Sequence, residues 1–312
     1  MERWSEAMER ALYAPGTGFF VGADRPSEHF RTSVHASPLF AGALGRLLDR
    51  VDEALGRPAT LDVVDVGAGR GELLVALAFA AGASLRARLR LTAVELAARP
   101  PYLPPDIAWV SSLPSSVTGL LLATEWLDNV PLDLAALDST GVARYVLTDG
   151  SLGDPVCAEE AAWLAEWWPL EQGAIAEIGL PRERAWRAAV SAVTGGLAVC
   201  VDYGHLRDDR PVLGTLTGYR GGRQLPPVPD GACDLTAHVA VDALGGTVLR
   251  QRDALRALGV SGARPSLSLA STDPAGYVRA LAAAGAAAEL IDPAGLGGHF
   301  WVVEPIGIGS PL

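Results

Sequence analysis

The chain has 312 residues, of which 49% are hydrophobic and 20% charged, so it can bury a sizeable core. Its net charge is −11 and its pI about 4.9, and no basic patch is visible, which argues against a nucleic-acid partner. Three widely spaced cysteines and five scattered histidines form neither a disulfide framework nor a metal motif. We therefore expect no bound metal and a reducing compartment.

No segment of the sequence has the pattern of a targeting signal or a membrane anchor. The N-terminus is acidic and amphipathic, unlike a signal or transit peptide. The longest apolar runs fall short of the roughly 18 residues needed to span a bilayer. We therefore expect a cytoplasmic protein with no membrane partner.

The first half of the chain alternates helical and strand patterns. Residues 1–13 and 37–55 favour helices, and a loop rich in glycine, proline and serine separates them. The valine-rich run at 61–66 predicts a buried strand that leads into a helix. Three further strands are predicted at 88–96, 107–110 and 119–127. Strands that alternate with helices at this spacing predict a parallel sheet.

The second half begins with an irregular region. Residues 131–180 predict a β-hairpin or two short strands, followed by a helix, and we interpret this region as an insertion at the ligand edge of the sheet. A helix at 182–193 then leads into a fifth buried strand that ends near Asp202. A Gly/Pro-rich loop at 214–234 follows, and loops of this length are usually functional or disordered. The remaining predicted elements are a short strand at 237–241 and two helices at 251–258 and 274–285. A last pair of strands, at 287–292 and 299–305, is spaced for a hairpin.

The stretch VVDVGAGRGE, residues 63–72, joins the first strand to its helix by a glycine-rich turn. A dinucleotide-binding turn needs its third glycine where Glu72 stands, and a P-loop needs a lysine that this chain lacks. S-adenosylmethionine fits better, because it carries no phosphate and its ammonium and sulfonium groups suit an acid such as Asp65. Glu95, 24 residues after Gly71, stands where an acid at the end of the second strand can accept ribose hydroxyls. A tight turn that binds nothing is the alternative.

Seven motifs of the chain occur in a familiar order. They are ALYAPGTGFF, HFRTSVHASPLF, VVDVGAGRGELL, TEWLDNVP, VDYG, GTLTGYRGG and DLTAHV. In these motifs, from about residue 7 to residue 304, the chain resembles the MidA family of class I methyltransferases. That family includes a mitochondrial complex I assembly factor that methylates an arginine of a complex I subunit.

The resemblance implies an α/β fold. This fold is the Rossmann-like, seven-stranded sheet of class I methyltransferases with helices on both faces, and its last two strands would form the C-terminal hairpin. An N-terminal helical arm would precede the sheet, and an insertion would separate its fourth and fifth strands. We divide the chain accordingly into three parts. Residues 1–57 form an arm with a covering loop, residues 58–130 and 181–312 form the core, and residues 131–180 form a lid or substrate insertion.

The resemblance also implies S-adenosylmethionine as the methyl donor and S-adenosylhomocysteine as the product. It places the cofactor at the glycine turn and the acid after the second strand, at Gly67, Gly69, Gly71 and Glu95. To this set we add neighbours on the turn and after the second and fourth strands, namely Asp65, Ala68, Leu96 and Glu125.

The chain departs from the family at several positions. In TSVHAS, Val34 and His35 replace a proline and a glutamate of the family pattern. TEWLDNVP keeps Glu125, Asp128 and Pro131, whereas ELAARPPYL lacks the usual serine and Leu-Arg pair. These departures indicate a diverged branch of the family. For such a branch, the resemblance supports the cofactor more strongly than it supports the arginine substrate.

The candidate catalytic residues are Glu125, Asp128, Tyr203 and His35. Glu125 and Asp128 lie just past the fourth strand, where ligands of open α/β sheets bind. Such a carboxylate pair can hold a guanidinium or take a proton from a nucleophile. Alternatively, Asp128 caps a helix and Glu125 is an ordinary strand-end anion. Tyr203 could line the methyl-transfer site, or it could be a half-buried residue that packs against its neighbours. His35 could be a general base or a solvated loop residue.

Three functional hypotheses follow from these residues and the resemblance. The first is an S-adenosylmethionine-dependent methyltransferase that acts on a protein, with arginine as a candidate acceptor. The second is a methyltransferase with a small-molecule acceptor. The third is a non-catalytic assembly factor that keeps the fold and binds a partner. The oligomeric state is left open, with a homodimer as one option.

Overall fold

The computed structural model describes residues 1–22 and 38–312 of the chain. His35, the whole TSVHAS motif and most of the predicted covering loop lie outside the described residues. None of the helices in the two described ranges is long and apolar enough to cross a membrane.

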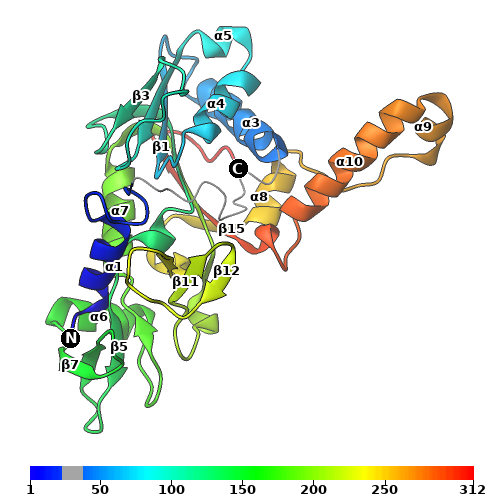
Figure 1. The fold of residues 1–312 in the computed structure, drawn as a ribbon. Helices are drawn as coiled ribbons and strands as arrows, with labels where there is room; N and C mark the ends of the chain where they lie inside the picture. The colour runs from blue at the N-terminus through cyan, green and yellow to red at the C-terminus, as the bar shows by residue number, and fades with distance from the viewer. Residues whose placement is uncertain (23–37) are drawn as a thin grey trace.

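A seven-stranded sheet in the order β15-β16-β9-β4-β1-β2-β3 forms the centre of the fold (Figure 1). The strands from β9 to β3 run parallel, whereas β16 is antiparallel to both of its neighbours. The predicted fold class is therefore confirmed. The seven strands are β1 (Leu61–Val66), β2 (Leu89–Val94), β3 (Ile107–Val110), β4 (Val117–Thr124), β9 (Val193–Asp202), β15 (Thr247–Arg250) and β16 (Phe300–Ile306).

Helices cover both faces of this sheet, because side chains alternate between the faces along each strand. On one face, Val63 of β1 and Leu122 of β4 pack with α3, α4, α8 and α10. On the other face, Val64 and Leu121 pack with α7. These helices, with the short α5, are α3 (Pro38–Ala54), α4 (Glu72–Ala80), α5 (Ala83–Arg86), α7 (Leu180–Ser191), α8 (Gln251–Ala257) and α10 (Pro274–Leu290).

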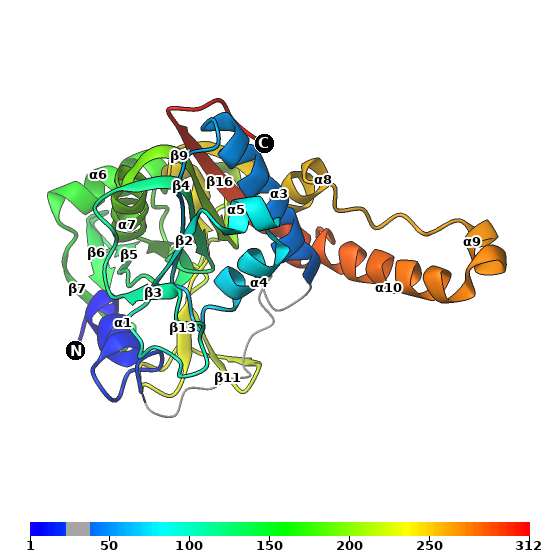
Figure 2. The ribbon, with the colours of Figure 1, turned by 90° about the horizontal axis from the view of Figure 1, so that it is seen from above.

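Smaller sheets stand beside the main one. Between β4 and β9 the chain forms a four-stranded sheet in the order β7-β6-β5-β8, and after β9 it forms β12-β11-β13 and the pair β10-β14. Helix α1 packs its predicted apolar face against the first two of these sheets (Figure 2). The elements are α1 (Trp4–Tyr13), β5 (Leu134–Leu137), β6 (Ala143–Val146), β7 (Leu152–Pro155), α6 (Ala158–Trp167), β8 (Ala176–Glu177), β10 (Gly204–His205), β11 (Thr217–Arg220), β12 (Arg223–Leu225), β13 (Asp234–Thr236) and β14 (Val239–Ala240).

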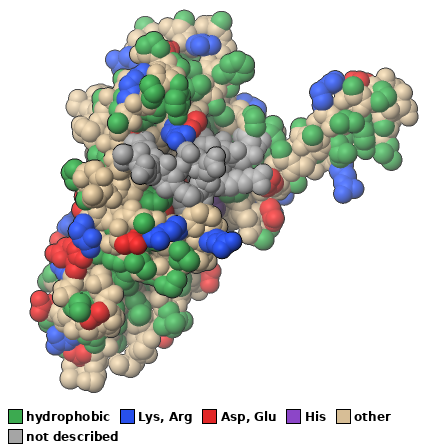
Figure 3. Space-filling model, viewed as in Figure 1, with side chains coloured by type: hydrophobic (Ala, Val, Ile, Leu, Met, Phe, Trp, Pro, Cys, Tyr) green, Lys and Arg blue, Asp and Glu red, His purple; other side chains and the backbone are tan. Residues whose placement is uncertain are grey.

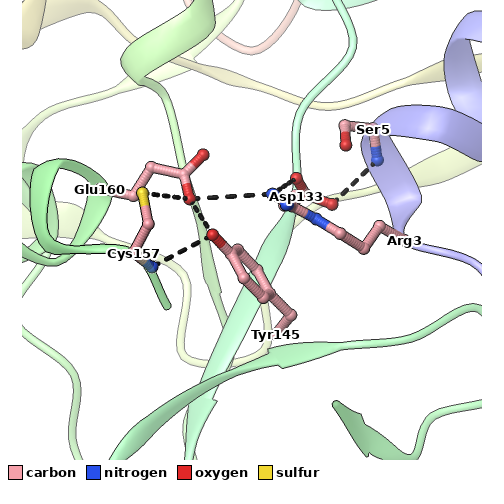
Figure 4. A network of polar contacts seen from close by, with 6 residues as sticks. All are labelled: Arg3, Ser5, Asp133, Tyr145, Cys157 and Glu160. Atoms are coloured by element: carbon pink, nitrogen blue, oxygen red, sulfur yellow. Dashed lines mark hydrogen bonds and ion pairs between the residues drawn. The ribbon is translucent and has the colours of Figure 1, made fainter. Parts of the chain in front are cut away.

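A polar network fastens α1 to the four-stranded sheet (Figure 4). The Arg3 guanidinium forms an ion pair with Asp133 and lies 3.7 Å from the ring centroid of Tyr145. The other oxygen of Asp133 accepts the backbone N–H of Ser5 at 3.0 Å. The Tyr145 hydroxyl donates to Glu160 at the start of α6. The N-terminal helix is thus joined to the four-stranded sheet by an ion pair with the buried Asp133 as well as by apolar packing.

Two predictions for the second half of the chain are wrong. Residues 287–292 do not form a strand: they close α10, because the alanine run before them favours a helix. The partner of β16 is instead β15, which lies three helices earlier in the chain. The predicted loop at 214–234 contains the hairpin β11-β12, whose turn uses Gly221 and Gly222 at φ 58° and 71°.

Asp133→Ala should destabilise the fold by about 2–4 kcal/mol, because it leaves the Arg3 guanidinium and the Ser5 N–H without their acceptor. The loss should appear as a lower Tm and as faster proteolysis within residues 14–22, which follow α1. Asp154→Ala, at an exposed acid on β7 of the same sheet, is the matched control. Equal Tm values for the two variants would contradict this role of Asp133.

Candidate active site

The three glycines of the turn between β1 and α4 serve two purposes. Gly67, Gly69 and Gly71 have φ values of 71°, 58° and 80°. A Cβ on Gly67 would lie 2.8 Å from the Trp126 ring, and one on Gly71 would lie 2.7 Å from Leu103. A Cβ on Gly69 would meet no atom within 4 Å. Gly67 and Gly71 therefore serve packing, whereas Gly69 faces open space at the end of the sheet.

Glu95 follows β2 and lies beside this turn, because β1 and β2 are parallel neighbours. Its carboxylate accepts the N–H of Gly69 at 3.0 Å and the N–H of Ala97 at 2.9 Å. The structure thus brings together the glycine turn and the acid that the sequence placed 24 residues further on. Ala68 is buried on the turn, and Leu96 is exposed next to Glu95.

Asp65 lies at the end of β1 beneath the turn and is 2% exposed. Its Oδ1 accepts no hydrogen bond from the described residues. Burial raises the pKa of Asp65 to about 8, and the nearby acids Glu95 and Glu72 add to the rise. The carboxyl that we expected as an anion is therefore mostly protonated at neutral pH until a cation or a hydrogen-bond donor approaches it.

Glu125 and Asp128 follow β4, as predicted, but in different environments. Glu125 is half-buried and has a φ of 49°, a strained conformation for any residue with a side chain. Its N–H donates to the carbonyl of Val201 on β9 at 2.8 Å. Asp128 lies on a short 3₁₀ turn, Leu127–Asn129, and is 3% exposed.

The Asp128 side chain binds two hydroxyl groups rather than capping a helix. Its Oδ2 accepts the hydroxyl of Thr236 at 2.7 Å and that of Tyr203, and the two hydroxyls also contact each other. The cap of the turn comes from Asp202, which accepts the N–H groups of Leu127 and Asp128 at 3.0 and 3.3 Å. Tyr203 is therefore tied to Asp128 through its hydroxyl.

Four acids gather here, and we call Glu125, Asp128, Asp202 and Asp234 the carboxyl cluster. Burial raises the pKa of Asp128, although its hydrogen bonds with Tyr203 and Thr236 act in the opposite direction. Burial, Asp128 and Glu125 together raise the pKa of Asp202 well above its usual value. Burial and Asp128 do the same for the pKa of Asp234. An approaching cation would offset these rises, because a nearby positive charge lowers the pKa of a carboxyl group.

A buried arginine on α7 holds the backbone around this cluster. The Nε of Arg182 donates to the carbonyl of Val130 at 3.1 Å, and its Nη2 donates to the carbonyl of Asp128 at 2.6 Å. Its Nη1 donates to the carbonyls of Ala237 and His238 at 2.8 and 3.1 Å. Arg182 thus joins the segment after β4 to the segment between β13 and β14.

All three histidines of the described residues lie in one group of rings with Tyr203. The Tyr203 ring lies 5.1 Å from the ring of His238 and 5.7 Å from that of His299, and the rings of His238 and His205 are 6.4 Å apart. Burial lowers the pKa of His205 to about 3 and that of His299 to about 4. These two rings are therefore neutral at pH 7 and add no positive charge to the site.

Several residues of the site were not predicted. Tyr13 donates its hydroxyl to the carbonyl of Asn129 at 3.2 Å, and the side chain of Asn129 donates to Asp234 at 2.7 Å. Tyr13, Asp234 and Thr236 lie within the motifs ALYAPGTGFF and DLTAHV, so the resemblance could have pointed to them. Arg182 lies in none of the motifs. Among the described residues, no group of three or more His, Cys, Asp or Glu side chains could hold a metal ion.

Asp65→Asn should stabilise the protein at pH 8 and leave its stability unchanged near pH 4. The pKa of Asp65 rises from 3.8 to about 8 on folding, so the folded state keeps a proton that the unfolded state releases. Stability therefore falls as pH rises through this window, by about 1.4 kcal/mol per unit of pKa difference, whereas asparagine stays neutral. Tm measured at the two pH values checks this, with Asp106→Asn at an exposed acid as the control. An equal Tm gain at both pH values would contradict it.

Comparison with known proteins identifies the family. A family model described as "Putative S-adenosyl-L-methionine-dependent methyltransferase" matches residues 43–261. No protein with a curated function matches the chain.

Two crystal structures of proteins from Burkholderia thailandensis resemble this one over nearly its whole length. The first protein, described as a "likely methyl transferase" and bound to S-adenosyl-homocysteine, is 27% identical with a TM-score of 0.77. The second, a native structure, is 28% identical with a TM-score of 0.76. Each match covers 99% of this chain and 88% of the other. The MidA-type resemblance is consistent with these matches. Because the family model spans most of the chain, this protein belongs to that family and is an S-adenosylmethionine-dependent methyltransferase.

Proposed function

We propose that this methyltransferase acts on a cationic acceptor, the arginine side chain of a protein. The observation that carries the proposal is Glu125, the half-buried member of the carboxyl cluster, which has a positive φ. Backbone strain of this kind costs on the order of 1–3 kcal/mol and persists mainly at functional sites. A half-buried carboxylate held in this way is suited to a bidentate contact with a guanidinium.

The residues around the glycine turn suit the methyl donor. When bound, S-adenosylmethionine supplies an electrophilic methyl group on a positively charged sulfur. Gly69 leaves open space at the turn, and Glu95 keeps lone pairs that can accept ribose hydroxyls. The Oδ1 of Asp65, which accepts no hydrogen bond from the described residues, can accept a donor from the amino-acid part of the cofactor. Ala68 and Leu96 would complete this side.

The acceptor side requires groups that orient a nucleophile and take its proton. Glu125 would contact the guanidinium directly, because it is the most accessible acid of the carboxyl cluster. Asp128, held by Tyr203 and Thr236, would set the negative potential beneath it. A guanidinium stays charged at physiological pH, so methyl transfer needs nearby carboxylates to receive the proton that leaves nitrogen.

The remaining parts of the chain would enclose this site. We propose that α1 and the insertion at 131–180 form the wall on the acceptor side, since Tyr13 reaches Asn129 beside the carboxyl cluster. Cys157, Cys200 and Cys233 are free thiols, which suits the reducing compartment expected for a cytoplasmic protein.

Gly69→Val should weaken S-adenosylmethionine binding at least about tenfold, which corresponds to about 1.4 kcal/mol. A Cβ at Gly69 would meet no atom of the described protein within 4 Å, so the new side chain would enter the open space at the turn, and the positive φ there adds backbone strain that the control shares. Isothermal titration calorimetry measures the effect. Gly56→Val is the matched control, because Gly56 also has a positive φ, 73°, and open space around it, yet lies far from the turn, after α3. Equal affinity in both variants would contradict the cofactor position.

Glu125→Gln should lower the rate of methyl transfer about tenfold or more. We assign Glu125 to the acceptor side rather than to the cofactor set predicted from the sequence, so S-adenosylmethionine affinity should stay unchanged. The rate is measured as transfer of labelled methyl groups into a cell lysate of the source organism. Glu53→Gln, at an exposed acid on α3, is the control.

The same labelling decides the acceptor class. Label on protein that is recovered as methylarginine after acid hydrolysis supports the proposal. Label found solely in the small-molecule fraction rejects it in favour of a small-molecule acceptor. An unchanged rate in Glu125→Gln would remove Glu125 from the acceptor site.

A further inference from the structure

One arginine of the glycine turn differs from the other covered arginines in its surroundings. The chain contains no lysine, and several of its arginine side chains lie beside acidic ones on the face seen in Figure 3. Within residues 1–22 and 38–312, seven arginines are buried or half-buried. Six of them form ion pairs or hydrogen bonds with other groups of the protein, namely Arg3, Arg88, Arg144, Arg182, Arg210 and Arg252. The side chain of the seventh, Arg70, forms neither within the part of the chain that the structure describes.

Arg70 lies between Gly69 and Gly71, where the main chain is fixed on both sides of it. The N–H of Gly69 donates to Glu95 at 3.0 Å. The N–H of Gly71 donates to the carbonyl of Ala68 at 2.8 Å. A Cβ on Gly69 would meet no atom within 4 Å, so the turn borders open space directly before Arg70. A half-buried guanidinium loses part of its hydration, and this cost is offset only when its donors find acceptors, which indicates a ligand as the partner of Arg70.

The methyl donor has one charged group that the residues described so far do not match. The amino-acid end of S-adenosylmethionine carries an ammonium and a carboxylate, and its sulfur carries a further positive charge. Asp65 and Glu95 suit the ammonium and the ribose hydroxyls, whereas an acid repels the carboxylate. Asp65, Glu72 and Glu95 lie close enough together that the last two raise the pKa of the first. A carboxylate that enters these acidic surroundings needs a cation beside it.

We propose that the Arg70 guanidinium binds the carboxylate of the cofactor's amino-acid end, while the Oδ1 of Asp65 accepts a hydrogen bond from the ammonium. A planar guanidinium can donate two parallel hydrogen bonds to a carboxylate. Arg99, which follows β2, is committed elsewhere, because it donates to three main-chain carbonyls between residues 103 and 107. The proposal rests on the cofactor that the family uses and is independent of the acceptor.

This arrangement makes the protein selective for a donor with an intact amino-acid end. Decarboxylated S-adenosylmethionine keeps the ammonium, the sulfonium and the ribose, but it lacks the group that Arg70 binds. Methylthioadenosine lacks the whole amino-acid end. The native protein should bind the decarboxylated compound roughly ten- to a hundredfold more weakly than S-adenosylmethionine, which is the range for a hydrogen bond between charged groups.

Isothermal titration calorimetry of the whole protein with these three compounds tests the proposal. Arg70→Ala should weaken S-adenosylmethionine binding about tenfold or more, and its affinities for the other two compounds should stay at or above the native values. Arg70→Lys should fall between Arg70→Ala and the native protein, because lysine keeps the charge but lacks the planar fork. Arg86→Ala removes an exposed arginine beyond the other end of α4, and this control should bind all three compounds like the native protein.

Reversing the charge at this position gives a further test. Arg70→Glu should bind the decarboxylated compound more tightly than S-adenosylmethionine, the opposite order to the native protein, because the introduced glutamate repels a carboxylate and attracts an ammonium. Methylthioadenosine carries neither charge, so its binding to this variant should match the native protein and verify the fold.

Three results would each overturn this role of Arg70. The first is a native protein that binds both donors equally. The second is an equal affinity for S-adenosylmethionine in Arg70→Ala and Arg86→Ala. The third is an Arg70→Ala variant that loses affinity for all three compounds by the same factor, because this would show that Arg70 supports the shape of the turn rather than binding the carboxylate.

Discussion

The candidate acceptor site depends on one buried guanidinium. Arg182 is 1% exposed, and it donates its hydrogen bonds to main-chain carbonyls, those of Val130 and Asp128 on one side and of Ala237 and His238 on the other. A buried cation is costly unless its donors are satisfied and negative charge lies nearby. Here the carbonyls satisfy the donors and the carboxyl cluster supplies the charge. The same contacts fix the position of Asp128, so the geometry of the cluster follows from this arginine.

The electrostatics of the site favour positively charged ligands. Burial raises the pKa values of Asp65, Asp128, Asp202 and Asp234, so negative charge on these groups is costly unless a cation lies nearby. A sulfonium on one side and a guanidinium on the other would both shift these groups toward their ionised forms. Burial lowers the pKa of His205 to about 3 and that of His299 to about 4, so these two rings add no positive charge that would weaken this preference. A cationic donor and a cationic acceptor would therefore both be stabilised by these carboxyl groups, although separate residues would hold them.

The two sides are also joined mechanically. Glu95 accepts the N–H of Gly69, so the end of β2 sets the shape of the glycine turn. A Cβ on Gly67 would strike Trp126, which lies directly after the strained Glu125, so the turn also packs against the segment that follows β4. A displacement of either side would move the other, which suits a reaction that requires an in-line approach of two reactants.

The sequence by itself determined the features that depend on neighbouring residues. The buried strand at 61–66, the glycine turn, the acid after β2, the apolar face of α1 and the order of motifs all follow from local spacing, and they fix the fold class and the cofactor. Tertiary structure alone decided which distant groups meet. The roles of Arg182 and Thr236 arise from contacts across more than fifty residues. The pairing of β15 with β16 could not be predicted either, because no local pattern encodes which strands become neighbours once helices intervene. The alanine-rich run before β16 has no strand periodicity, so it gave no sign of a partner strand there.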